Sequence, residues 1–266
     1  MIIQQIRNAT LKIEYAGKTF LIDPWLAPKG GMGSFAQTPF RPGSDVDPAM
    51  YDAPMPLVDL PEPVESVLAG VDFYLLTHLH PDHFDMDKRT GRLGPMLNKR
   101  TPIYVQNGEE AALLRENGFA EVGYLQDAGV RFGRGTVYRV GASHGEEKPC
   151  GPSSGLVFRS PDEKTLYIAG DTVWYEGMLR NLKTFEPDVV VLNACAASLE
   201  GYGHLITGDE AVERVHAVLP GARIVASHMD TVAHATLTRK TLKEKLQKRG
   251  LADRVLIPED GEKMTF

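Results

Sequence analysis

The chain contains little cysteine, no long apolar run and no excess of basic side chains. Its 266 residues include two cysteines, Cys150 and Cys195, too few for a disulfide framework. No apolar run approaches the roughly 18 residues that cross a bilayer. The net charge of −6 and the isoelectric point near 5.8 argue against nucleic acid or an anionic membrane as the main partner.

The N-terminus also lacks a signal for export. It reads Met-Ile-Ile-Gln-Gln, with no charged segment followed by an apolar core. We therefore expect no signal peptide. This start and the missing membrane-spanning run predict a soluble, cytoplasmic protein.

The chain does contain enough apolar sequence for a large core. Hydrophobic residues make up 42% of it, and no repeat, linker or low-complexity tract interrupts it, so we expect one domain over residues 1–266. Nine of the 18 prolines lie between Pro24 and Pro63, which predicts a Pro/Gly-rich insertion at about 25–63 without regular structure. Its aromatic residues would line a pocket or a subunit contact. A loose surface insertion is the open alternative.

Short β-forming runs alternate with helical segments along the rest of the chain. Antiparallel strands are expected within residues 2–23, and a buried strand at 73–76. The other predicted strands are 102–105, 122–125, 130–132, 136–140, 155–159, 165–169, 188–192, 222–226 and 254–257. The predicted helices are 64–69, 108–116, 175–183, 207–219 and 237–248, and the fourth opens with a capping box from Thr207 to Glu210.

One stretch joins a buried strand to a dense group of polar side chains. The apolar run Phe73–Leu76 is typical of a buried strand. His78, His80, Asp82 and His83 follow it within six residues. Imidazole and carboxylate are ligands suited to Zn²⁺, Mn²⁺ and Fe²⁺. A lone histidine is usually an ordinary surface or core residue, but three imidazoles crowded beside a buried strand need partners. The cluster therefore predicts a metal site.

The segment from His78 to His83, with Thr77 and an apolar strand before it, resembles the His-x-His-x-Asp-His signature of the metallo-β-lactamase superfamily. The resemblance implies three more ligands downstream, a histidine, an aspartate and a last histidine, each at the end of a strand. The chain supplies them in that order, after predicted strands: His144, Asp171 and His228.

The resemblance also implies the fold and the cofactors. The expected α/β fold is a four-layer αββα sandwich, in which two mixed β-sheets pack face to face with helices outside. Two divalent metal ions are expected, with zinc first and manganese or iron as alternatives. The implied ligands are His78, His80 and His144 for one cation, Asp82, His83 and His228 for the second, and Asp171 between them.

Within the superfamily, the chain looks most like the bacterial hydrolase branch that includes L-ascorbate-6-phosphate lactonase. This likeness rests on Asp23-Pro24, on the run from Leu76 to Asp85, on Gly170-Asp171-Thr172 and on the terminal Glu-Asp-Gly-Glu. These features are less specific than the metal motif. They suggest the branch and do not identify the substrate.

The resemblance implies a hydrolase that acts on a small molecule. A hydroxide that bridges the two cations would attack an ester, lactone, amide or phosphodiester centre. Asp171 would position the hydroxide, and Asp82 would assist proton transfer. Two alternatives stay open: an iron-dependent redox enzyme with the same ligands, and a protein that binds metal without catalysis. The sequence leaves self-association into a homo-oligomer open as well.

Five further residues are candidates for supporting roles. Asn193, at the end of a predicted strand, is expected to hydrogen-bond substrate, and Trp25 to wall the pocket. His234 lies in a loop expected to fold over the site, where it would touch substrate or support a ligand. Asp23 would either orient a ligand histidine or form a turn before the next proline. Cys195 is expected to serve packing.

Overall fold

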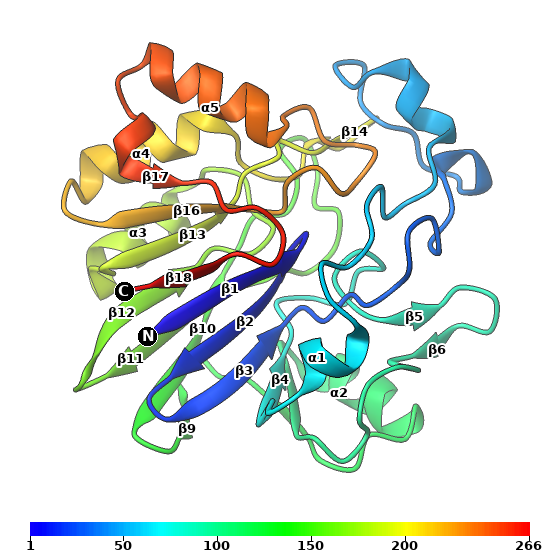
Figure 1. The fold of residues 1–266 in the computed structure, drawn as a ribbon, viewed down its shortest axis with the longest axis vertical. Helices are drawn as coiled ribbons and strands as arrows, with labels where there is room; N and C mark the ends of the chain where they lie inside the picture. The colour runs from blue at the N-terminus through cyan, green and yellow to red at the C-terminus, as the bar shows by residue number, and fades with distance from the viewer.

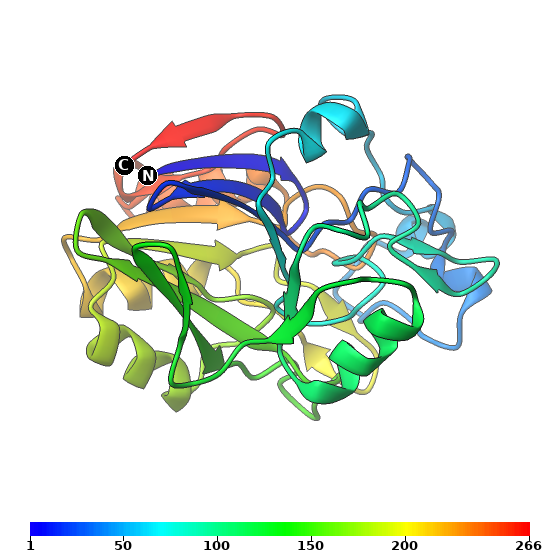
Figure 2. The ribbon, with the colours of Figure 1, turned by 90° about the horizontal axis from the view of Figure 1, so that it is seen from below.

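Two seven-stranded β-sheets pack face to face in the computed structural model, which describes all residues 1–266. Both sheets are mixed, and Figure 2 shows them as two layers. Helices cover the outer faces. The expected four-layer αββα sandwich is confirmed.

The first sheet is antiparallel on one side and parallel on the other. Its strand order is β18-β1-β2-β3-β4-β7-β8. In β2, apolar residues alternate with Lys12 and Glu14, so one face of the strand is buried. The strands are β1 (Ile2–Arg7), β2 (Thr10–Tyr15), β3 (Lys18–Ile22), β4 (Phe73–Leu75), β7 (Ile103–Val105), β8 (Val122–Tyr124) and β18 (Lys263–Thr265).

The second sheet has the order β17-β16-β13-β12-β11-β10-β9. Its interior strand β13 is buried along its whole length and apolar up to Asn193, as expected for a parallel strand covered on both faces. The strands are β9 (Val130–Phe132), β10 (Gly135–Gly141), β11 (Ser154–Ser160), β12 (Glu163–Ile168), β13 (Val189–Asn193), β16 (Arg223–Ser227) and β17 (Val255–Leu256).

Five α-helices flank the sheets, and short elements lie in the loops. The helices α3, α4 and α5 lie together beside the second sheet in Figure 1. The α-helices are α1 (Val64–Leu68), α2 (Gly108–Glu116), α3 (Glu176–Phe185), α4 (Asp209–Val218) and α5 (Arg239–Lys248). The short elements are β5 (Met86–Asp87), β6 (Arg92–Leu93), β14 (Ser198–Leu199), β15 (Gly203–His204), and the 3₁₀ turns η1 (Phe35–Gln37), η2 (Pro48–Asp52) and η3 (Ala252–Arg254).

Apolar side chains fill all three spaces between the four layers. Between the sheets, Phe20 of the first sheet packs edge-on against Phe158 of the second, with ring centroids 5.3 Å apart. Outside the second sheet, Leu182 of α3 and Leu242 of α5 are fully buried. Outside the first sheet, Leu114 of α2 is fully buried. This burial of apolar area is the main favourable term in folding.

Several local features differ from those predicted, and the short strands β5, β6, β14 and β15 were not expected. The capping box at Thr207 is wrong: the hydroxyl of Thr207 donates to the carbonyl of Asn193, so Gly208 caps α4. The strand β18 was not expected, because Lys263–Thr265 is too short to show alternation. It pairs with β1, which brings the two termini together at one edge of the first sheet (Figure 1).

The Pro/Gly-rich segment of residues 25–63, called the excursion below, lies against one end of the sandwich. It contains two 3₁₀ turns and no other helix until α1. Single β-bridges join Gly33 to Met55 within the excursion and Pro42 to Leu199 of β14. Figure 1 shows this segment at the upper right, next to β14.

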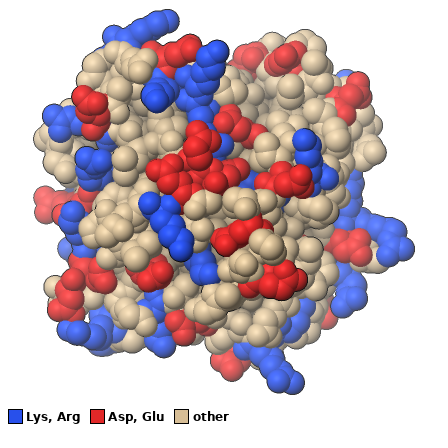
Figure 3. Space-filling model, in the orientation of Figure 1, with Lys and Arg blue, Asp and Glu red and all other residues tan.

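No helix is both long enough and apolar enough to cross a bilayer. On the face shown in Figure 3, acidic and basic side chains are interspersed, and no continuous basic surface is visible. The expectations about partners that rest on net charge stay predictions.

Candidate metal centre

The seven predicted ligands meet at one end of the sandwich. The segment His78–His83 follows β4 of the first sheet. The other three ligands follow strands of the second sheet, His144 after β10, Asp171 after β12 and His228 after β16. The two sheets thus place their strand ends side by side, and residues far apart in sequence converge there.

One group contains His78, His80 and His144, whose ligand atoms lie within 4.8 Å of one another. The Nδ1 atom of His80 is 3.3 Å from Nε2 of His144. The other side of the His80 ring faces the backbone. A Cβ on Gly151, which has φ of +125°, would lie 3.1 Å from His80 Nε2, so a residue with a side chain would strain this contact.

A second group contains Asp82, His83 and His228, again within 4.8 Å of one another. Nε2 of His228 lies 3.2 Å from Nε2 of His83 and 3.5 Å from Oδ2 of Asp82. His228 has φ of +64°, in the left-handed region that histidine rarely adopts. Such backbone strain is found most often at functional sites.

Asp171 lies between the two groups. Its Oδ2 atom is 3.1 Å from Nε2 of His83, 3.8 Å from Nε2 of His78 and 4.0 Å from Nε2 of His144. The amide of Asn193 donates a hydrogen bond of 2.6 Å to Oδ1 of Asp171. This contact fixes the carboxylate so that Oδ2 faces the histidines.

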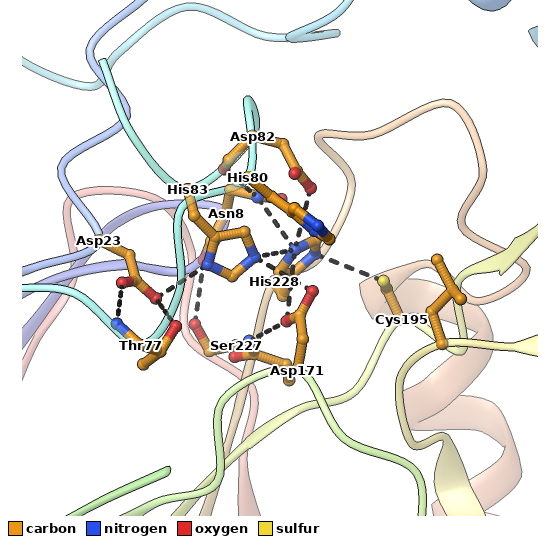
Figure 4. Close-up of polar contacts among 12 residues, drawn as sticks. Asn8, Asp23, Thr77, His80, Asp82, His83, Asp171, Cys195, Ser227 and His228 are labelled. Atoms are coloured by element: carbon orange, nitrogen blue, oxygen red, sulfur yellow. Dashed lines mark hydrogen bonds and ion pairs between the residues drawn. The ribbon is translucent and has the colours of Figure 1, made fainter. Parts of the chain in front are cut away.

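Four of the five histidines have their outward ring nitrogen held by the protein. Such contacts fix ring orientation and tautomer in metal sites. The contacts are His78 Nδ1 to Thr77 Oγ1 at 3.1 Å, His83 Nδ1 to Asp23 Oδ2 at 2.8 Å, His144 Nδ1 to the Leu205 carbonyl at 3.1 Å, and His228 Nδ1 to Cys195 Sγ at 3.5 Å. Figure 4 shows the contacts of His83 and His228.

The carboxylates make this centre favourable for positive charge. Burial lowers the pKa of His83, but Asp171 and Asp23 outweigh burial and raise that pKa to about 10. Burial raises the pKa of Asp171, but His83 and His228 outweigh it and hold the pKa well below its usual range. Asp171 is therefore ionised throughout the physiological range.

The donor set fits divalent cations. His83 donates from Nδ1 to Asp23, so the lone pair of the neutral ring lies on Nε2, which faces Oδ2 of Asp171 at 3.1 Å. Two electron pairs this close need a proton or a cation between them. The buried Nε2 of His78 has no hydrogen-bond partner in the protein. Imidazole and carboxylate are the donors that zinc, manganese and iron sites use.

A cavity of about 450 Å³ opens beside the centre. Four predicted ligands line it, namely His80, Asp82, His144 and Asp171. Eleven of its 23 lining residues belong to the excursion, including Phe35 and Phe40. The excursion thus forms much of the wall of the cavity, and the open alternative of a loose insertion does not describe this structure.

The structure separates the residues predicted to contact substrate. Trp25 and His234 line the cavity, and the His234 ring lies edge-on to Phe35 with centroids 5.3 Å apart. Asn193 is buried, lies off the cavity wall and contacts Asp171 instead. Asn193 therefore supports the ligand Asp171 and does not face the cavity.

Two residues with polar contacts at the centre carried no signal, or a weak one, in the sequence. Asn8, in the turn between β1 and β2, touches His228 and the Asp82 backbone. Cys195, expected to serve packing, is fully buried and also touches His228. Asn8 follows β1 and Cys195 follows β13, but the sequence does not show that the ends of these two strands lie at the metal centre. His204, for which the sequence suggested no role, lies 3.1 Å from a carboxylate oxygen of Asp45 in the excursion.

Comparison with known proteins identifies the family. A family model described as "Beta-lactamase superfamily domain" matches residues 18–229. The chain belongs to the metallo-β-lactamase superfamily. It is 39% identical over its whole length to UPF0173 protein YddR of Bacillus subtilis, and 100% of both chains is covered. It is 28% identical to a UPF0173 metal-dependent hydrolase of Xanthobacter autotrophicus, over 70% of this chain and 68% of that one.

Two solved structures are similar over their full length. An isothiocyanate hydrolase from Delia radicum gut bacteria has a TM-score of 0.88 and 40% identity, with 100% of this chain and 99% of that chain covered. A possible metal-dependent hydrolase from Veillonella parvula has the same TM-score and 33% identity, with the same coverage. These relatives make this a family of metal-dependent hydrolases. None of them is named as L-ascorbate-6-phosphate lactonase, so that branch stays a prediction.

Proposed function

We propose that this protein is a hydrolase with two divalent cations, and that its substrate is a small, mainly apolar molecule with an electrophilic carbon. The observation that carries the proposal is the position of Asp171. Its Oδ2 atom lies within 4.0 Å of His78 and His144 on one side and of His83 on the other. A carboxylate there can serve both cation sites at once.

The cations would supply Lewis-acid chemistry, since they lower the pKa of a water to about 7 and stabilise negative charge on the substrate. The protein supplies position and proton transfer. Asp171 is held by Asn193 and orients the nucleophile. Asp82 lines the cavity, and one of its oxygens is 3.5 Å from His228. It is the carboxylate through which a proton can pass to the leaving group.

The cavity supports an uncharged substrate. Eleven of its 23 lining residues are hydrophobic. Lys88 is the one lysine or arginine among them, and its Nζ already donates to Gln37. A phosphodiester is best held by several cationic donors, which this wall does not offer. Among the substrate classes expected from the sequence, esters, lactones and amides therefore fit better than phosphodiesters.

The full-length similarity to an isothiocyanate hydrolase makes isothiocyanates the first substrates to test. Their central carbon is electrophilic, and the remainder is an apolar alkyl or aryl group that suits the wall around Phe35 and Phe40. Addition of one water breaks the carbon–nitrogen link and releases the amine and carbonyl sulfide. His234 lines the same wall, and its Nδ1 is buried without a partner, so it is placed to hydrogen-bond the substrate.

The experiment uses the purified chain loaded with zinc, manganese or iron in turn. Amine release from benzyl isothiocyanate is measured beside a panel of esters, lactones and phosphodiesters, together with metal content and the visible spectrum. We expect turnover of the isothiocyanate at two metal ions per chain. A coloured iron form with oxygen-dependent turnover would instead support the redox alternative. Metal binding without turnover of any substrate in the panel would support the alternative of a protein that binds metal without catalysis.

The matched variants are Asp171→Ala and Asp127→Ala. Asp127 is an exposed carboxylate that pairs with Arg139 away from the cavity. We expect Asp171→Ala to stay folded, to lose one metal ion and to lose most turnover, while Asp127→Ala keeps both. Full activity with two metal ions in Asp171→Ala would refute the role of this residue.

A further inference from the structure

Asn8 lies in the tight turn between β1 and β2, at the bottom of the metal centre. Its side chain is fully buried. Its φ of +55° is in the left-handed region, which asparagine tolerates better than most residues. Its Oδ1 atom is buried without a hydrogen-bond partner. A buried, unsatisfied amide costs stability, so its presence here calls for a reason other than packing.

The contacts of Asn8 reach two predicted ligands of the second cation. Its Nδ2 donates to the backbone carbonyl of Asp82 at 3.0 Å and lies 3.1 Å from Nε2 of His228. Its own carbonyl accepts a hydrogen bond of 3.0 Å from the backbone N–H of His228. The same carbonyl accepts from the hydroxyl of Ser227 at 3.0 Å. Figure 4 shows Asn8 between the Asp82 loop and His228.

These contacts join loops from different sheets. Asp82 is 74 residues from Asn8 and follows β4 of the first sheet, whereas His228 is 220 residues away and follows β16 of the second. The first group of ligands, with His144, has no contact of this kind with Asn8. The amide thus contacts ligands of the Asp82–His83–His228 group and none of the His78–His80–His144 group.

We propose that Asn8 is a positioning residue that sets the affinity of the Asp82–His83–His228 group for its cation, and so decides whether the centre holds one cation or two. This inference rests on the proposed two-cation centre. The side-chain amide fixes the Asp82 loop, and the main-chain carbonyl fixes the loop that presents His228. The distance of 3.5 Å between Asp82 Oδ2 and His228 Nε2 depends on both.

The chain offers a variant that separates the two contributions. Asn8→Gly tolerates the positive φ without strain, so the turn and its carbonyl contacts to His228 and Ser227 persist. Only the amide contacts are lost. The matched control is Ala16→Gly, at a turn residue between β2 and β3 with a φ of +51° and no contact with the centre.

The test is calorimetric binding of Zn²⁺ and of Mn²⁺ to the metal-free full-length chain, with metal content counted by mass spectrometry and the melting temperature of the metal-free form measured alongside. We expect two binding steps in the wild type and in Ala16→Gly. In Asn8→Gly we expect one step to be unchanged and the other to lose about 10- to 100-fold in affinity. A merely structural role would instead lower the melting temperature of the metal-free chain and weaken both steps.

The outcomes distinguish this inference from the proposed function. Two cations in the wild type with both steps unchanged in Asn8→Gly would overturn the role of Asn8 alone. A single cation in the wild type would overturn the two-cation centre and this inference with it. Equal weakening of both steps would also overturn it.

Discussion

The guanidinium of Arg7 lies 5.0 Å from the centre of the Trp25 ring, and its Nη2 donates to the carbonyl of Trp25 at 3.0 Å. Nη2 also donates to Ala27, and Nη1 donates to Val58 at 3.2 Å. One fully buried cation therefore ties both ends of the excursion to β1. Because the excursion forms much of the cavity wall, Arg7 fixes the segment that would contact substrate. Its neighbour Asn8 contacts the segments that carry the predicted ligands Asp82 and His228.

Replacement of Arg7 by lysine should loosen the wall while leaving the metal centre intact. A single ammonium group cannot match the planar fork that reaches three carbonyls. We expect Arg7→Lys to lose about 1.5–3 kcal/mol of unfolding free energy and to raise KM with unchanged metal content. Arg139→Lys, in a half-exposed ion pair with Asp127, is the control and should change neither quantity. An unchanged KM in Arg7→Lys would show that the wall does not depend on this residue.

Replacement of Asp23 by asparagine should weaken metal binding without removing a ligand. Asp23 accepts from His83 through Oδ2, and from the backbone and hydroxyl of Thr77. Its φ of +45° suits asparagine equally well. Because an amide has only one acceptor oxygen, at least one of these donors loses its partner. Metal affinity measured by competition with a chelator should fall about 10- to 100-fold. An unchanged affinity would leave Asp23 with a turn-forming role alone.

The stability of the chain should fall in mild acid because of His234. Burial lowers the pKa of this ring to about 4, against 6.5 when unfolded. Between pH 6.5 and 4, His234 is protonated in the unfolded chain and neutral in the folded chain. Stability therefore falls as pH decreases from 6.5 towards 4, by up to about 3 kcal/mol from this group. Bound cations nearby would repel the proton and act in the same direction.

The variant His234→Phe isolates this contribution. Urea unfolding at several pH values should show that the free energy of unfolding falls less steeply with decreasing pH in His234→Phe than in the wild type. His216→Gln, on the outer helix α4, provides the control and should follow the wild-type curve. Parallel curves for the wild type and His234→Phe would mean that His234 is not buried as a neutral ring.

Removal of metal should lower the melting temperature. Cations held between loops of both sheets bind the folded chain and not the unfolded one. At a free metal concentration of about 1,000 times Kd, one site contributes about 4 kcal/mol. For a chain of this size that corresponds to a shift of roughly 10 °C or more. Calorimetry with and without a chelator measures it, and Asp171→Ala should show a smaller shift. Coincident melting curves would argue against cations that join the sheets.

Many of the strands could be predicted because each shows a short apolar run in the sequence. The strands before His78, Asp171 and His228 each end in a run of buried residues, and the structure has them where expected. The ligands then follow from the known order of the family signature. Short-range pattern was therefore sufficient for most strands, while their arrangement in two sheets and the ligands at their ends came from the family resemblance.

Apart from the contact of Asp23 with His83, the contacts behind the ligands could not be predicted, because they depend on pairing between distant segments. Nothing around Asn8 in the sequence connects it with His228, 220 residues away. Asn193 was assigned to substrate because its strand ends near the site, but whether its amide faces the cavity or Asp171 depends on where the strand stops. The strand β18 was missed for a similar reason, since its only sign is its partner β1.

The origin of the ligands in both sheets has a consequence for the lifetime of the protein in a cell. Proteases cut chains that open, and the open fraction rises as the folded state loses stability. A chain that lacks its cations would lose the link between the two sheets, and would open and be degraded more readily than the metal-bound chain. The abundance of this protein should therefore follow the supply of divalent metal to its host as well as the rate of its synthesis.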